Sequence, residues 1–269
     1  MEVVCFFPGL LGSELRTLAG MTVWPPTVDE VIDGSLGADK IAALLSEDDL
    51  VSVGAVEKVC LKIIYRGVLN SIEDAGFSRH QGPKHLAVMH HDWRLDIVDE
   101  VAPELANRLD ELVANGADTF HFVAHSMGGL IARILMQDPQ YEGRSWRGKV
   151  EQLITMATPF RGAPQALSRL VGLEGMLGIP AWAFAAFRTK PRLRAAYQLL
   201  PPKGDPLIWR VAGGRVHNVD LFAIDGFGEQ NGFLRNSLDS VGTLHAILDR
   251  PWPRNVARFQ FAGTGFERF

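Results

Sequence analysis

The segment from Thr119 to Gln137 constrains the fold of this chain more than any other. An apolar run, Thr119 to Ala124, leads into His-Ser-Met-Gly-Gly, and a helical pattern then continues to Gln137. Small residues two positions before and after Ser126 allow a sharp reversal from a strand into a helix. The pattern predicts a strand–turn–helix with the Ser126 hydroxyl exposed at its apex. The alternative is an ordinary turn that contains an incidental serine.

Apolar runs and helical patterns alternate along the rest of the chain. This alternation is typical of a mostly parallel sheet with helices on both faces. We therefore expect an α/β fold in a single domain over residues 1–269. The expected strands are residues 3–7, 86–90, 119–124, 150–156 and 259–262, and the expected helices are 96–115, 129–137 and 240–248.

Two regions interrupt this alternation. Residues 12–55 have no regular pattern, with Trp24-Pro25-Pro26 in the middle. Residues 163–190 form an apolar insertion whose central part, 171–187, carries a single charge and is interrupted by Gly172, Gly175, Gly178 and Pro180. The insertion is too short and too interrupted to span a bilayer. It is either a buried core helix or a cap over a site.

Composition excludes several classes of function. The net charge is −4 and no basic stripe is present, so nucleic acid is not an expected partner. Cys5 and Cys60 lie in apolar stretches and predict two buried, reduced thiols rather than a disulfide. No zinc-ligand spacing or phosphate-binding loop is present, so we expect no metal and no cofactor. Without a signal peptide or a transmembrane segment, a cytoplasmic location is expected.

The residues around Ser126 have the composition that acyl transfer requires. Ala124 and Gly128 are small enough for the strand and helix to pass closely. The carbonyl oxygen of a substrate becomes negatively charged during attack and needs preorganised backbone amides. We assign one amide to Met127, after the serine, and the other to Leu10, in the glycine-rich turn after the first strand. The alternative for Leu10 is a plain strand-ending turn.

The cluster His91-Asp92-Trp93-Arg94 follows the second expected strand. Adjacent residues rarely converge on one ion, so a metal site is disfavoured. We expect a structural role instead, with Trp93 buried and Asp92 or Arg94 held in a polar network.

Four separated stretches resemble the lecithin:cholesterol acyltransferase-like branch of the α/β-hydrolases, which includes lysosomal phospholipase A2. They are FFPGLLGSEL near the start, HDWRL with His91 where the family usually has Tyr, AHSMGG around Ser126, and ATPFRGAP at 157–164. A fifth, weaker match is AAYQLLPP at 195–202.

The resemblance implies an α/β-hydrolase fold with a cap, and a serine-dependent acyl ester hydrolase or O-acyltransferase. The substrate would be a lipid of the phospholipid or sterol ester class, with an acyl-enzyme formed on Ser126. Trp24 stands where the family has a tryptophan in a mobile lid. In the apolar insertion, Trp182 and Phe184 are the residues that we expect to contact lipid, which would allow peripheral membrane association.

The catalytic acid and histidine are not evident from sequence. In this fold they follow the serine in the order acid, then histidine. The ending Phe261-Ala262-Gly263-Thr264-Gly265 resembles the segment that precedes the family's acid, so the last strands, the acid and the base are expected beyond Phe269, in a further domain or a second chain. The in-chain alternatives are Asp205, Asp220, Asp225 and Asp239 as acids, and His217 and His245 as bases, with His245 expected on a helix surface. If the chain has lost this apparatus, it would be a non-catalytic lipid-binding or regulatory module.

Overall fold

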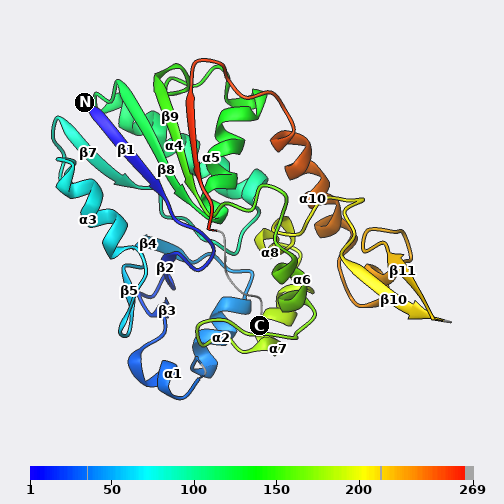
Figure 1. Ribbon diagram of the computed structural model, residues 1–269. Helices are drawn as coiled ribbons and strands as arrows, with labels where there is room; N and C mark the ends of the chain where they lie inside the picture. The colour runs from blue at the N-terminus through cyan, green and yellow to red at the C-terminus, as the bar shows by residue number, and fades with distance from the viewer. Residues whose placement is uncertain (35, 213, 264–269) are drawn as a thin grey trace.

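The structure, a computed structural model, describes residues 1–34, 36–212 and 214–263. At its centre lies a five-stranded sheet in the order β12-β9-β8-β1-β7, and every neighbouring pair is parallel (Figure 1). All five expected strands are confirmed, with ends shifted by at most a few residues. They are β1 (Glu2–Phe7), β7 (Lys84–Val88), β8 (Thr119–His125), β9 (Val150–Met156) and β12 (Ala257–Phe261).

Helices cover both faces of this sheet. The odd-numbered residues of β1 enter the core that contains α4 (Ala102–Ala114) and α5 (Met127–Gln137). Val4 and Phe6 point the other way and pack with α3 (Arg66–Asp74). A strand that is apolar on both sides can be buried on both sides, as a parallel sheet requires. The α/β-hydrolase type of architecture expected from the sequence is therefore confirmed.

The amphipathic segment after β7 forms one continuous helical element. It begins as a π-helix at Ile97–Val101 and continues as α4. The Asp96 carboxylate accepts the N–H groups of Val98 and Asp99 and so caps the first turn, as its position predicts. Gly116, with a φ of 93°, follows the helix end, where glycine avoids the steric cost of a left-handed backbone.

Residues 12–55 are not irregular, and this expectation was wrong. They contain a small antiparallel sheet in the order β3-β2-β4, together with α1 and α2. The strands are three to five residues long, too short for a periodic pattern to be visible in the sequence. The elements are β2 (Ser13–Arg16), β3 (Thr22–Trp24), β4 (Val51–Ala55), α1 (Val28–Ile32) and α2 (Ala38–Leu45).

The insertion 163–190 folds into two short helices, α6 (Pro164–Leu170) and α7 (Ala181–Phe187), which contact each other. α7 also contacts α2, and these helices lie beyond the carboxyl ends of the sheet strands (Figure 1). One face of α7 is buried, whereas Trp182 on the other face is 61% exposed.

The remaining elements surround this framework. α10 packs against both α5 and α8, and β10 pairs with β11 in a hairpin. In the described part of the chain, no helix has the length and apolar character needed to cross a membrane. These elements are β5 (Lys58–Val59), β6 (Lys62–Ile63), α8 (Ala195–Gln198), β10 (Ile208–Ala212), β11 (Arg215–Val219), α9 (Phe227–Gln230), α10 (Arg235–Leu248) and 3-10 helices at Pro139–Tyr141 and Arg147–Lys149.

Candidate active site

Ser126 lies at the apex between β8 and α5. Its backbone has φ 52° and ψ −125°, a strained region for a residue with a side chain. The turn is held because the Ser126 N–H donates to the Met156 carbonyl at 2.9 Å and the Gly129 N–H donates to the Ser126 carbonyl at 3.0 Å. This geometry places a half-buried serine at the N-terminus of an 11-residue helix.

Close backbone contacts explain the small residues around Ser126. A Cβ atom on Gly128 would lie 2.7 Å from the Phe7 carbonyl carbon, and one on Gly9 would lie 2.8 Å from Ser126 Cβ. Ala124 is fully buried in β8 and is paired with Phe7 of β1. The strand ends therefore converge so tightly at the serine that larger residues at 9 or 128 would displace the backbone.

The turn after β1 runs beside the serine. The Gly12 N–H donates to the Gly9 carbonyl at 2.9 Å, and Leu11 adopts a φ of 59°. Among the described residues, the backbone N–H groups of Leu10 and Met127 have no hydrogen-bond acceptor. Two unengaged amides thus belong to the segments that flank Ser126.

Tyr65, which the sequence analysis did not single out, joins this turn to the serine segment. Its hydroxyl accepts the Gly9 N–H at 2.9 Å and lies 2.8 Å from Nδ1 of His125. Burial raises the pKa of Tyr65 to about 12, and burial also lowers the pKa of His125. Because Tyr65 is 56 residues from Gly9 in sequence, no local pattern indicates this contact.

The in-chain candidates for acid and base are engaged elsewhere. No described side chain forms a hydrogen bond with Ser126 Oγ. His245 was expected on a helix surface, but it is buried and its Nε2 donates to the Leu200 carbonyl at 3.1 Å. Burial is the main cause of its lowered pKa. α8 and the residues after it cover this face of α10, which periodicity within α10 does not reveal.

The other candidates are on the surface or in surface ion pairs. His217 is exposed on β11. Asp205 pairs with Arg161 at 3.0 Å, and Asp239 lies 3.4 Å from Arg235. Asp220 accepts the backbone N–H of Phe222, and Asp225 is exposed in a turn with a φ of 53°.

Comparison with known families identifies the chain. The sequence model of lecithin:cholesterol acyltransferase matches residues 49–240, which include the serine apex. The chain belongs to the lecithin:cholesterol acyltransferase family. This family hydrolyses or transfers the acyl groups of lipid esters, which is the general class of activity expected here. The match begins after Leu10 and Trp24, so it does not extend to the turn after β1.

Two solved structures resemble this member of the lecithin:cholesterol acyltransferase family. A chain of the Tle4–Tli4 complex superposes with a TM-score of 0.66 at 15% identity, and the match covers 96% of this chain and 74% of that one. A Listeria innocua gene product gives a TM-score of 0.34 at 12% identity, covering 97% and 83%. Only the first likeness supports the fold. A comparison with curated protein sequences found no match.

The stretch that resembles the Tyr-Asp-Trp-Arg signature of this family has the structural role expected from its sequence. Arg94 is fully buried and makes an ion pair with Asp92 at 2.6 Å. The same guanidinium donates to the carbonyls of Ala43, Leu44 and Ser46 at the end of α2. These bonds to the carbonyls attach the end of α2 to the segment that follows β7. Among the described residues, no group of three or more acidic, His or Cys side chains is arranged to hold a metal.

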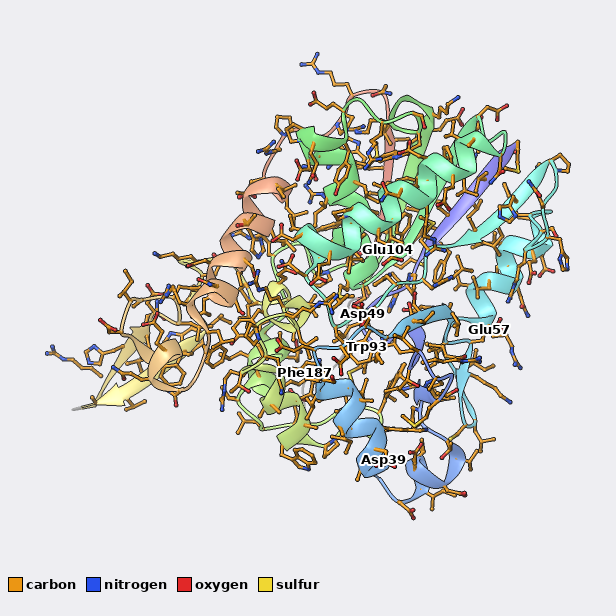
Figure 2. All side chains as sticks on the ribbon, turned by 180° about the vertical axis from the view of Figure 1, so that it is seen from behind. Asp39, Asp49, Glu57, Trp93, Glu104 and Phe187 are labelled. Carbon is orange, nitrogen blue, oxygen red and sulfur yellow. The ribbon has the colours of Figure 1, made fainter. Side chains whose placement is uncertain are left out.

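Two of the three expected lipid contacts are buried in this structure. The Trp24 indole is fully buried, donates to the Leu11 carbonyl at 2.8 Å and lies edge-to-face with Trp93 at 5.9 Å. Phe184 is 2% exposed and its ring lies 6.0 Å from that of Phe187 in a tilted arrangement. Phe187 in turn lies beside Trp93 (Figure 2). Of the three residues, only Trp182 is exposed in this structure. Trp93 gives Trp24 an apolar partner directly, and it contacts Phe184 only through Phe187.

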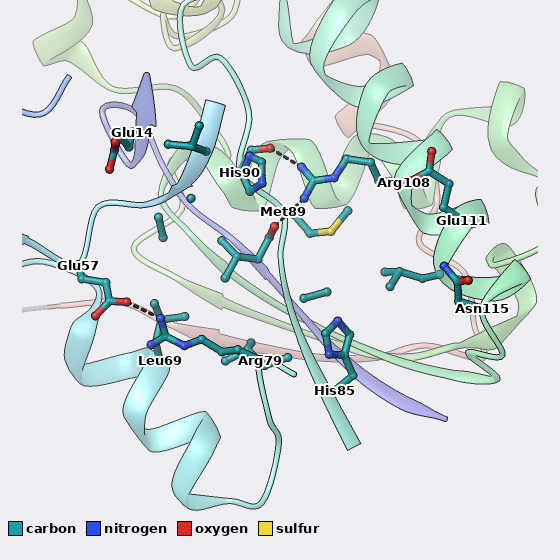
Figure 3. Close-up of a pocket in the computed structure, with 17 residues that line it drawn as sticks. Glu14, Glu57, Leu69, Arg79, His85, Met89, His90, Arg108, Glu111 and Asn115 are labelled. Carbon is teal, nitrogen blue, oxygen red and sulfur yellow. Dashed lines mark hydrogen bonds and ion pairs between the residues drawn. The ribbon is translucent and has the colours of Figure 1, made fainter. Parts of the chain in front are cut away.

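One pocket lies between the outer edge of β7 and α4, and Ser126 is not part of its lining (Figure 3). It has a volume of about 590 Å³, and its lining includes His85, Val88 and His90. Arg108 donates to the Val88 and His90 carbonyls and so satisfies part of this strand edge. Its lining does not include the serine apex or the turn after β1, so we do not assign the acyl chemistry to it.

Proposed function

We propose that this chain is a serine-dependent acyl ester hydrolase or O-acyltransferase that acts on lipid through an acyl-enzyme on Ser126. The observation that carries the proposal is the strained serine at the head of α5, with φ 52°. A serine in this position presents Oγ outward and receives the favourable field of the helix N-terminus.

The chemistry proceeds in two steps. Ser126 Oγ attacks the ester carbonyl and loses its proton to a base, and the N–H groups of Leu10 and Met127 stabilise the resulting oxyanion. The C–O bond to the alcohol then breaks, and the alcohol leaves with a proton. In the second step, water or a lipid alcohol attacks the acyl-enzyme and releases the acid or a new ester.

A second candidate is a non-catalytic lipid-binding module of the same fold. It is favoured by one observation, that no described imidazole is hydrogen-bonded to Ser126 Oγ. A serine without a base is a weak nucleophile, so the two candidates differ in the reactivity of this one side chain.

Labelling with a fluorophosphonate probe separates the two candidates. The enzyme hypothesis expects covalent labelling of the wild type, a modified peptide that contains Ser126, and no labelling of Ser126→Ala. Ser145→Ala is a suitable control, because Ser145 lies on the surface and its hydroxyl bonds to Asp110. Labelling that persists in Ser126→Ala would refute the assignment. A folded wild type that binds lipid but resists the probe would favour the binding module.

We also propose that Trp182, together with Leu173, forms a lipid-facing patch on the insertion 163–190. Leu173 is 78% exposed and Trp182 is 61% exposed. Exposed large apolar side chains have a cost in water that contact with lipid removes. The patch would bring the protein to a lipid surface reversibly.

A further inference from the structure

Tyr65 lies where two segments of the proposed active site meet. It directly precedes α3, on the opposite face of the sheet from α5, and is 5% exposed. Its ring packs edge-to-face against Phe6, with centroids 5.0 Å apart, and against His125, at 5.5 Å. The side chain therefore contacts both the end of β1 and the residue immediately before Ser126.

The hydroxyl of Tyr65 has a defined set of partners. It accepts the backbone N–H of Gly9 at 2.9 Å, so its own proton is available for Nδ1 of His125 at 2.8 Å. A hydroxyl that donates to Nδ1 requires the neutral His125 tautomer whose ring proton is on Nε2. The network runs from the turn after β1, through one oxygen, to the serine apex.

The same network determines which amide of the turn stays free. The Gly9 N–H is bonded to Tyr65, and the Gly12 N–H is bonded to the Gly9 carbonyl. Among the described residues, the Leu10 N–H has no such partner. Gly9 also approaches Ser126 so closely that an added Cβ would lie 2.8 Å from Ser126 Cβ. A small shift of Gly9 would therefore change the distance between the Leu10 amide and the serine.

We propose that Tyr65 is a positioning residue that holds the turn carrying the Leu10 amide at a fixed distance from Ser126. This inference rests on the proposed function, because it assigns Tyr65 a role in the same acyl transfer. Among the described residues, the hydroxyl bonds to Gly9 and His125 and not to the Ser126 oxygen, so it acts through these two residues. Preorganised donors lose their effect when they are displaced by about 1 Å, which can cost roughly 100-fold in rate.

Tyr65→Phe tests the inference, because it removes the hydroxyl and keeps the ring contacts. With a short-chain p-nitrophenyl ester, we expect kcat to fall by about 10- to 100-fold. KM should stay within about twofold, because the apolar surfaces are unchanged. Tyr141→Phe is the matched control: Tyr141 is also buried, but its hydroxyl has no hydrogen-bond partner among the described residues. It should leave both constants unchanged.

Amide NMR provides a readout that does not depend on activity. Tyr65→Phe should shift the Gly9 amide resonance and speed its hydrogen exchange, whereas Tyr141→Phe should not. An active wild type whose kcat is unaffected by Tyr65→Phe, or falls equally with both variants, would overturn the positioning role and leave the proposed function standing. An inactive wild type with the expected Gly9 change would support the loop contact and count against the proposed function. An unperturbed Gly9 amide in Tyr65→Phe would overturn the inference in either case.

Discussion

The carbonyl group of Phe7, at the end of β1, lies directly against the α carbon of Gly128 in the first turn of α5. A Cβ atom at position 128 would be 2.7 Å from the Phe7 carbonyl carbon, closer than real Cβ atoms come to their neighbours. Both partners are backbone groups, so neither side can rotate away. This contact joins strand β1 of the main sheet to the helix that carries the serine.

Gly128→Ala should therefore destabilise the protein. Forcing an atom into this contact is overpacking, which costs about 1–3 kcal/mol and sometimes more. The measurement is the free energy of unfolding in urea. Gly242→Ala is the control, since Gly242 lies at an exposed position in the middle of α10 with open space around it. Alanine there should increase stability by about 0.5–1 kcal/mol. Equal effects of the two substitutions would contradict the close contact.

Leu10 should contribute through its backbone rather than its side chain. Leu10→Ala retains the N–H and should retain most of the esterase activity. Leu10→Pro removes the donor and should reduce kcat by roughly 10²- to 10³-fold. Circular dichroism must show that both variants fold. If the two substitutions have equal, small effects, Leu10 is not part of the site.

Substitution of Trp182 should affect lipid binding, whereas substitution of Phe184, on the same helix α7, should affect stability. Trp182→Ser, at an exposed position, should change the free energy of unfolding by no more than about 0.5 kcal/mol but weaken co-sedimentation with vesicles. Phe184→Ser, at a buried position, should lower stability by about 3–5 kcal/mol. Binding should be stronger to vesicles with phosphatidylglycerol than to pure phosphatidylcholine, because Arg169 and Arg188 flank the central part of the insertion, residues 171–187. A wild type that binds neither kind of vesicle would refute the lipid-facing patch.

His91 should make stability depend on pH below neutrality. Burial lowers its pKa from 6.5 to about 4. The unfolded chain therefore binds more protons than the folded one between these values. Stability is complete above pH 6.5 and falls as the pH drops toward 4, by about 1.4 kcal/mol per pH unit for this one group. The free energy of unfolding, measured in urea at several pH values across this window, should change less steeply with pH for His91→Gln than for the wild type. Identical slopes would mean that His91 does not titrate differently in the two states.

The position of the nucleophile candidate was predictable because its signals are local. A strand, a reversal and a helix follow one another within the 19 residues from Thr119 to Gln137, and the small residues at 124 and 128 reflect the steric needs of that reversal. The strands of the main sheet were predictable for a related reason. Burial on both faces leaves uninterrupted apolar runs, which sequence alone displays.

Burial was not predictable where it depends on a partner that is distant in sequence. His245 is polar and was expected on the surface of its helix, yet Leu200 and α8 cover it. Trp24 and Phe184 resemble lipid-contacting residues, yet both reach the aromatic cluster around Trp93. Periodicity describes the faces of one element and does not show which face another element will cover.

The sequence by itself determined the α/β architecture, the serine apex and the family, because each depends on short-range backbone geometry or on contiguous motifs. Only the tertiary structure decided how the site is assembled. Gly9, Tyr65 and His125 are separated by 56 and 60 residues along the chain, and a single hydroxyl joins them. Such a contact forms only when the chain brings β1, α3 and β8 together, since hydrogen bonds act over about 3 Å regardless of sequence distance.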